Sequence, residues 1–158
     1  MNFARWSLLL STLMFVTGLW FVLASPRGQT PGPTQPAPAT VRQLMLGLVI
    51  PASTTIYQAA GTVSTLEGTT ERAPRDDKEW EVVAAHAAVL IEASHLLRSE
   101  GRGVADAVWT GAAADMEAGA RNVLAAAQAK NVDSLLDKGG EIVAACDRCH
   151  EKFLPGSR

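Results

Sequence analysis

The sequence predicts an all-α protein: an antiparallel up-down-up-down four-helix bundle preceded by an N-terminal membrane segment. Between residues 41 and 153, apolar residues recur every three to four positions, as they do along one face of an α-helix. The pattern falls into four stretches of about 20 residues. The segments that connect them are short or moderate in length, and such connections favour antiparallel neighbouring helices. No stretch alternates apolar and polar residues with period two, and no hairpin turn is recognisable.

The N-terminal element is an uncharged run, residues 6–24, which follows Arg5. Its length is close to the roughly 20 residues that span a bilayer as a helix. A positive residue before an apolar run also describes a secretory signal, and Val22-Leu23-Ala24 offers a cleavage point. We favour a transmembrane anchor that spans residues 1–24 rather than a cleaved signal, because the apolar run exceeds the ~7–15 residues usual for a signal core. Both interpretations carry the rest of the chain across the membrane, and cleavage would leave it soluble there.

Residues 25–40 contain five prolines and few residues that could be buried. This composition predicts an extended, semi-rigid spacer. The globular domain then covers residues 41–158. The formal net charge of the chain is −2, and without a basic excess nucleic acid is not an expected partner.

The first helix of the bundle is predicted over residues 41–63, with Thr40 as its cap. Pro51 lies inside it, where it removes one hydrogen bond and pushes against the carbonyl group of Gly47. We therefore expect a kink or a fresh start at this proline. Residues 67–75 are expected to form a loop.

The other three helices are predicted from Asp76-Asp77 to residues 100–103, over residues 104–130, and over residues 134–153. Gly111 and Gly119 lie within the third helix, where each costs about 1 kcal/mol relative to alanine. Such glycines indicate close approach of a neighbour. Gly139-Gly140 in the last helix predicts either a break or a similarly close approach.

The most specific motif is Cys146-Asp147-Arg148-Cys149-His150, which has the C-x-x-C-H pattern of covalent c-type haem attachment. Its two thiols bond to the two vinyl groups of one porphyrin, and the imidazole of His150 then lies under the iron. Cys146, Cys149 and His150 share one helical face. Apolar residues continue that face toward the core: Leu135, Ile142, Val143 and Phe153.

Three other interpretations of the motif are weaker. A thioredoxin-like C-x-x-C requires a βαβ context early in a domain. A structural zinc site requires four ligands, whereas this segment supplies three. Two ordinary helical cysteines remain the simplest alternative. The chain has two cysteines in all, and both belong to the motif.

These features resemble the class II c-type cytochromes, the cytochrome c prime family, over residues 41–153. The C-x-x-C-H motif at the end of the last helix selects this class, and Val41-Arg42-Gln43-Leu44-Met45 is similar to the start of the family's first helix. Members carry His-x-x-Tyr or His-x-x-Phe, matched here by His150 and Phe153. Many then have a basic residue, where this chain has Leu154. The resemblance implies one covalent haem c, a periplasmic location and, in many members, a homodimer through the first two helices.

The family divides by what the first helix places over the iron. Met45 is the predicted sixth ligand, because a thioether suits haem iron and raises its reduction potential. A methionine on an apolar stripe is more often a core residue. If Leu46 or Leu48 lies over the iron instead, the distal face is apolar and open. His86 and His95 on the second helix are weaker candidate ligands.

The predicted function is periplasmic electron transfer through one haem, ligated by His150 and Met45, with redox proteins in or at the inner membrane as partners. One alternative is a five-coordinate protein that binds nitric oxide or carbon monoxide. Another is an assembly module whose redox activity is incidental. We do not expect an enzyme, because outside the motif there is no dense cluster of acids, bases and nucleophiles.

Overall fold

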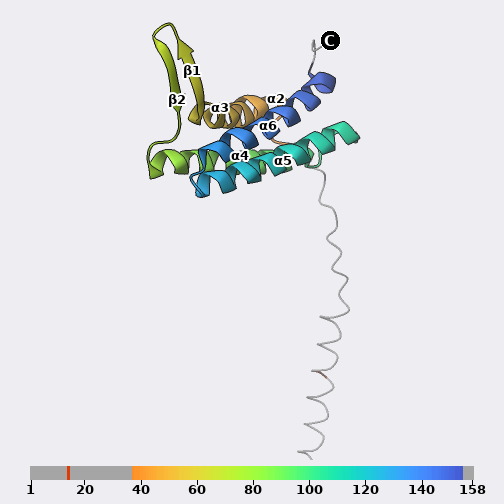
Figure 1. The fold of residues 1–158 in the computed structure, drawn as a ribbon. Helices are drawn as coiled ribbons and strands as arrows, with labels where there is room; N and C mark the ends of the chain where they lie inside the picture. Colours follow the sequence, from red (N-terminus) through yellow and green to blue (C-terminus); the bar gives the residue numbers. More distant parts are fainter. Residues whose placement is uncertain (1–13, 15–36, 155–158) are drawn as a thin grey trace, which may run out of the picture. The chain divides into compact units, whose positions relative to one another are not determined.

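A computed structural model describes Met14 and residues 37–154. The fold below is that of the second of two units of the chain, Pro36–Arg158. The predicted membrane segment and most of the predicted spacer lie outside the described residues. The second unit is mostly helical (Figure 1).

The first helical rod consists of α2 (Val41–Leu44), η1 (Met45–Val49) and α3 (Ile50–Ala59), where η1 is a π-helical turn. Thr40 caps the rod, as predicted, and does so through a reciprocal capping box with Gln43. The irregularity expected at Pro51 is also present: the π turn η1 ends just before this proline.

The prediction that the first helix reaches residue 63 is wrong, as is the prediction of no hairpin. Strands β1 (Gly61–Thr65) and β2 (Gly68–Arg72) form an antiparallel pair in which Thr65 lies opposite Gly68. The helix ends because Ala60 is extended and Gly61 has φ +148°, a conformation that favours glycine. Gly68, at φ +138°, follows the two-residue turn. The hairpin projects beyond the helices (Figure 1).

Three long helices follow: α4 (Asp77–Arg98), α5 (Ala107–Gln128) and α6 (Val132–Phe153). Each helix is preceded by a capping residue whose side chain accepts hydrogen bonds from backbone N–H groups of the first turn. These residues are Asp76 for α4, Asp106 for α5 and Asn131 for α6. The sequence-based bounds of these helices are correct to within three residues. Gly139 and Gly140 do not interrupt α6, which is continuous.

Neighbouring helices run antiparallel. Lys130 after α5 bonds Asp77 at the start of α4, and Phe153 at the end of α6 contacts Trp109 at the start of α5. The first rod packs mainly on α4, and α6 packs mainly on α5. In the described part of the chain, these four rods are compatible with the predicted all-α bundle.

The core lies on the predicted helical stripes. All seven residues of the α4 stripe are buried: Trp80, Val83, Ala87, Leu90, Ile91, Ser94 and Leu97. Gly119 marks the close approach of α6 to α5, because a Cβ atom there would lie 3.0 Å from Cγ1 of Ile142. Gly111 marks no such approach, since nothing lies within 4 Å of its equivalent position.

Among the described residues, α4 is also the one helix long and apolar enough to cross a membrane. Its buried stripe faces the bundle, as expected for the central helix of a core. The core therefore accounts for its hydrophobicity.

Candidate haem-attachment site

Helix α6 carries the C-x-x-C-H motif on its inner side, next to residues of the same helix that are buried in the core. Ile142 and Ala145 are buried, while Cys146 and Cys149 are half-buried and pack against the hydrophobic core. His150 is also half-buried. The prediction that all apolar residues on this face point inward is wrong for Val143, which is 40% exposed. The motif therefore lies at the edge of the core.

Both cysteines are free thiols. Burial raises the pKa of the Cys146 thiol above its usual range, with smaller contributions from the charges of Asp147 and Cys149. Burial likewise raises the pKa of Cys149. Two protonated thiols held one helical turn apart are the groups that attachment to a porphyrin requires.

The end of α6, just after His150, is fixed against the start of α5. The rings of Phe153 and Trp109 pack edge to face, and the Trp109 indole donates a hydrogen bond of 2.9 Å to the carbonyl oxygen of Leu97. Lys152 bonds a carboxylate oxygen of Asp106 at 2.6 Å. These contacts hold the motif's helix at the connection between α4 and α5.

The first helical rod begins at this same connection. Nε of Arg102 donates a hydrogen bond of 2.9 Å to the carbonyl oxygen of Ala39, immediately before the cap residue Thr40. Met45 follows one turn into the rod and is half-buried against the core. Met45 and His150 therefore belong to the same end of the bundle, although they are more than 100 residues apart in the sequence.

Tyr57 on α3 is a site residue that the sequence analysis missed. Burial raises the pKa of its phenol to about 12, and the nearby charges of Cys146 and Asp147 add to this increase. Helix α3 also packs on α6, so Tyr57, although 37% exposed, lies on the helix of the first rod that contacts the motif's helix. Its position is not evident from the sequence, because the π turn changes which residues of the rod share a side.

The two other candidate ligands have partners elsewhere. His86 is half-buried, and its Nδ1 lies 2.8 Å from the carbonyl oxygen of Val82 one turn back. His95 is exposed, with its Nε2 3.5 Å from the carboxylate of Glu117. Arg98 and Arg121 pair with the same carboxylate. Met116 of α5 is buried in the core.

The donor set fits covalent haem attachment. Among Met14 and residues 37–154, no three His, Cys, Asp or Glu side chains converge as a metal-ion site. Covalent haem attachment needs no such convergence, because the thiols would bond to the edge of the porphyrin, and of these four residue types only His150 would approach the metal. The residues that would hold the group are Cys146, Cys149 and His150, with Met45 from the first rod.

No family model, curated protein or solved structure matches this chain. The assignment of the site therefore depends on its own residues and their placement.

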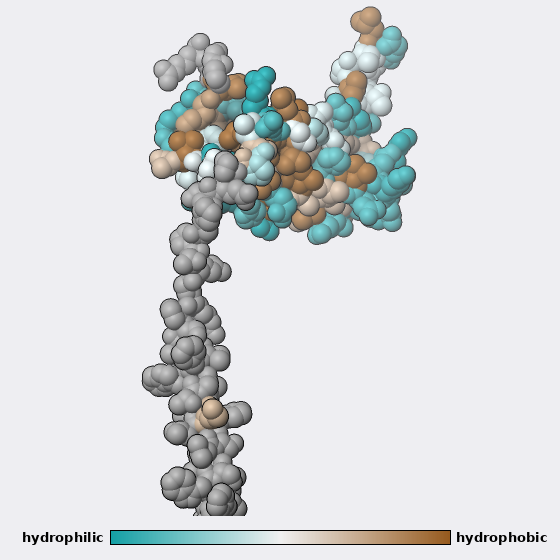
Figure 2. All heavy atoms as spheres, turned by 180° about the vertical axis from the view of Figure 1, so that it is seen from behind, coloured by the Kyte–Doolittle hydropathy of each residue, from teal (hydrophilic) through white to brown (hydrophobic). Residues whose placement is uncertain are grey.

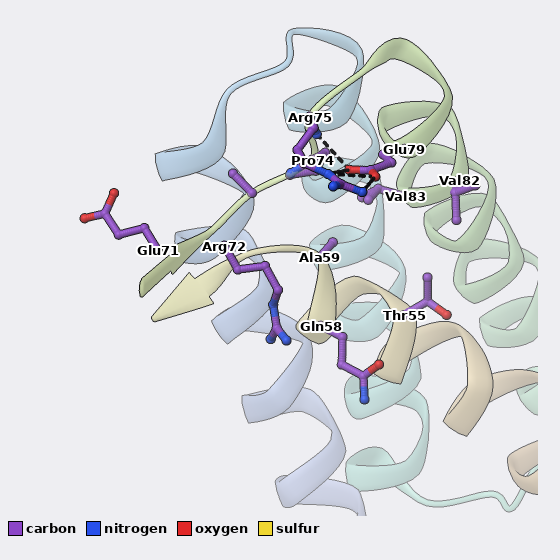
Figure 3. A pocket seen from close by; sticks show the side chains of 11 residues that line it. Thr55, Gln58, Ala59, Glu71, Arg72, Pro74, Arg75, Glu79, Val82 and Val83 are labelled. Carbon is purple, nitrogen blue, oxygen red and sulfur yellow. Dashed lines mark hydrogen bonds and ion pairs between the residues drawn. The ribbon is translucent and has the colours of Figure 1, made fainter. Parts of the chain in front are cut away.

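A separate cavity of about 570 Å³ lies between α3, β2 and the start of α4 (Figure 3). Thr55 and Gln58 of α3 line one side of it, and an ion pair between Arg75 and Glu79 forms part of another. Arg75 lowers the pKa of the Glu79 carboxyl by hydrogen bonding. None of the lining residues comes from α6, so this cavity is separate from the C-x-x-C-H segment.

Proposed function

We propose that this protein is a periplasmic electron carrier with one covalently bound haem c. The observation that carries the proposal is the C-x-x-C-H motif on the core side of α6, with two free, half-buried thiols followed by His150. It lies at the end of the bundle where the first helical rod starts.

Exposed apolar residues on the first rod and on α6 support this proposal. Leu46 and Ile50 of the first rod are more than half exposed, and Val143 of α6 is exposed one turn before Cys146. Figure 2 shows apolar side chains gathered across the middle of one face of the domain. Burying apolar area stabilises a complex by about 25 cal/mol per Å². A porphyrin is a large apolar plate that can cover such surface.

When bound, the haem supplies one-electron transfer between ferric and ferrous iron. The residues of this chain determine where that group is held and which potential it has. Cys146 and Cys149 would hold it covalently, and His150 would provide an imidazole nitrogen to the iron. Met45 would provide a neutral sulfur, a ligand that stabilises ferrous iron and raises the reduction potential. The packed bundle holds these side chains in place, so that little reorganisation accompanies the electron.

The proposed location follows from the N-terminal sequence. An anchor over residues 1–24 and a proline-rich spacer up to residue 40 would tether the haem domain to the inner membrane on its periplasmic side. A tethered domain can reach redox proteins in or at the membrane. Such encounters are usually small in area and short-lived.

The first experiment is production of the full chain in cells that mature c-type cytochromes. Covalent haem is detected by the mass increase and by the pyridine haemochrome spectrum. We expect one haem per chain in the wild type and none in a Cys146→Ser/Cys149→Ser variant. Wild-type protein without covalent haem would overturn the proposal.

A second measurement separates electron transfer from gas binding. Optical and paramagnetic-resonance spectra of the wild type should show low-spin ferric haem with a methionine–iron charge-transfer band, and Met45→Ala should lose this band. A five-coordinate gas-binding protein is the second candidate. Leu46, next to Met45, is an exposed apolar residue, and if it lay over the iron in place of Met45, the sixth position would be open to a gas. A high-spin wild type that binds nitric oxide or carbon monoxide rapidly would favour that function.

A further inference from the structure

The π turn η1 is the least regular part of the first helical rod. The N–H group of Ile50 donates to the carbonyl oxygen of Met45, five residues back, in place of the four-residue spacing of an α-helix. Pro51 follows, and it has no N–H group to offer the carbonyl oxygen of Gly47. The turn therefore lies where proline makes the regular α-helical pattern impossible.

The π turn changes which residues of the rod face the same way. Because the turn takes up one extra residue, a separation of twelve residues across it acts as about eleven, which is close to three full turns at 3.6 residues each. In an uninterrupted α-helix, two residues twelve apart would point about 120° away from each other. The burial pattern agrees with the shifted phase, because Leu44 and Ile56, twelve residues apart, are both buried in the same core.

The same shift applies to Met45 and Tyr57, which are also twelve residues apart. Helix α3, which carries Tyr57, packs on α6 as well as on α4. Burial raises the pKa of the Tyr57 phenol, and the charges of Cys146 and Asp147 on α6 add to this increase, in agreement with this packing. Because the π turn places Met45 on the same side of the rod as Tyr57, Met45 also belongs to the flank that faces the motif. In an uninterrupted α-helix, Met45 would be rotated away from that flank.

We propose that Pro51 is a positioning residue: by imposing the π turn, it orients Met45 toward the C-x-x-C-H segment as the sixth ligand of the haem. This inference rests on the proposed function, because it concerns the ligand of the same haem. Single π turns within α-helices occur frequently at functional sites. Here the turn has a defined consequence, which is the direction of one thioether.

The test compares haem-loaded wild type, Pro51→Ala and Thr54→Ala. Pro51 and Thr54 are both exposed residues of the same rod, so neither substitution opens a cavity in the core. Alanine at position 51 restores the missing N–H group and permits a regular helix. We expect Pro51→Ala to keep its covalent haem but to lose most of the methionine–iron charge-transfer band and to shift toward high spin. Thr54→Ala should match the wild type.

A second measurement reports on the turn without haem. In the Pro51→Ala apoprotein, the NMR coupling across the hydrogen bond should join the new amide at position 51 to the carbonyl carbon of Gly47, four residues back, as in a regular α-helix. A coupling to the carbonyl carbon of Leu46, five residues back, would show that the π turn persists without the proline and would overturn the claim that Pro51 imposes it. This measurement applies even if the variant attaches haem poorly.

The outcomes distinguish this inference from the proposed function. An undiminished charge-transfer band in Pro51→Ala would overturn the role of Pro51 while leaving the electron carrier intact. A wild type with covalent but high-spin haem would overturn the ligation of Met45, and the role of Pro51 with it. A wild type without covalent haem would overturn the proposed function itself.

Discussion

The rings of Trp109 and Phe153 meet edge to face, with 5.3 Å between their centroids and 86° between their planes. Phe153 lies one turn after His150, and the Lys152 ammonium group lies 5.4 Å from the centroid of the Phe153 ring. Edge-to-face pairs of this kind stabilise a fold by about 0.5–1.5 kcal/mol beyond the area they bury. This contact fixes the end of α6 that carries the proposed proximal ligand.

Replacement of Phe153 by alanine should therefore destabilise the domain. We expect a loss of about 2–3 kcal/mol in the free energy of unfolding, because the substitution removes a half-buried aromatic ring and its edge-to-face contact with Trp109. The measurement is urea unfolding of the apoprotein. Leu136→Ala is the matched control, since Leu136 lies on the same helix but is exposed. Equal destabilisation by both substitutions would show that the ring pair contributes nothing specific.

The two glycines of α5 should respond to alanine in opposite directions. At Gly119 the added Cβ would lie 3.0 Å from Cγ1 and 3.2 Å from the backbone nitrogen of Ile142, so α6 would have to move. We expect Gly119→Ala to cost about 1–3 kcal/mol through overpacking.

Gly111→Ala is the control for this prediction. It introduces the same methyl group on the same helix, where nothing lies within 4 Å. Its greater helix propensity should stabilise the domain by up to about 1 kcal/mol. The two unfolding midpoints should shift in opposite directions, and destabilisation of equal size by both variants would contradict the assigned contact with α6.

The long helices could be predicted from the sequence because burial alone determines their pattern. Every residue of the predicted α4 stripe, from Trp80 to Leu97, is buried. The hairpin gave no such signal. Its strands are exposed on both faces except for the half-buried Gly61, so no apolar alternation marks them. The first helix was extended too far because Val63 continued its apolar spacing, although Val63 is exposed on β1.

The candidate site was predictable where its residues are close in the sequence. Cys146, Cys149 and His150 follow one another within a single helical turn, so their spacing is sufficient to identify them. Tyr57 was not predictable, because it shares a side with Met45 only through the π turn. Pro51 indicated an irregularity, but the sequence does not distinguish a π turn from a kink, and the two give the helix different phases.

The phenol of Tyr57 provides a direct test of how the first rod lies against α6. Burial, with smaller contributions from Cys146 and Asp147, raises its pKa to about 12. Tyr57 is the only tyrosine in the chain, so the whole phenolate signal in an absorbance titration belongs to it. We expect the folded apoprotein to titrate near pH 12, and the protein in denaturant to titrate near the ordinary value of about 10.

The sign of the accompanying stability change follows from this difference. Above pH 10 the unfolded chain releases the phenolic proton while the folded chain retains it, so the folded state binds more protons and loses stability as the pH rises. The contribution of Tyr57 is therefore complete below about pH 10 and is lost as the pH approaches 12. Tyr57→Phe should remove this part of the alkaline destabilisation, and Asp147→Asn should lower the midpoint of the phenolate titration. A folded protein that titrates at the ordinary value would show that Tyr57 does not lie against the motif.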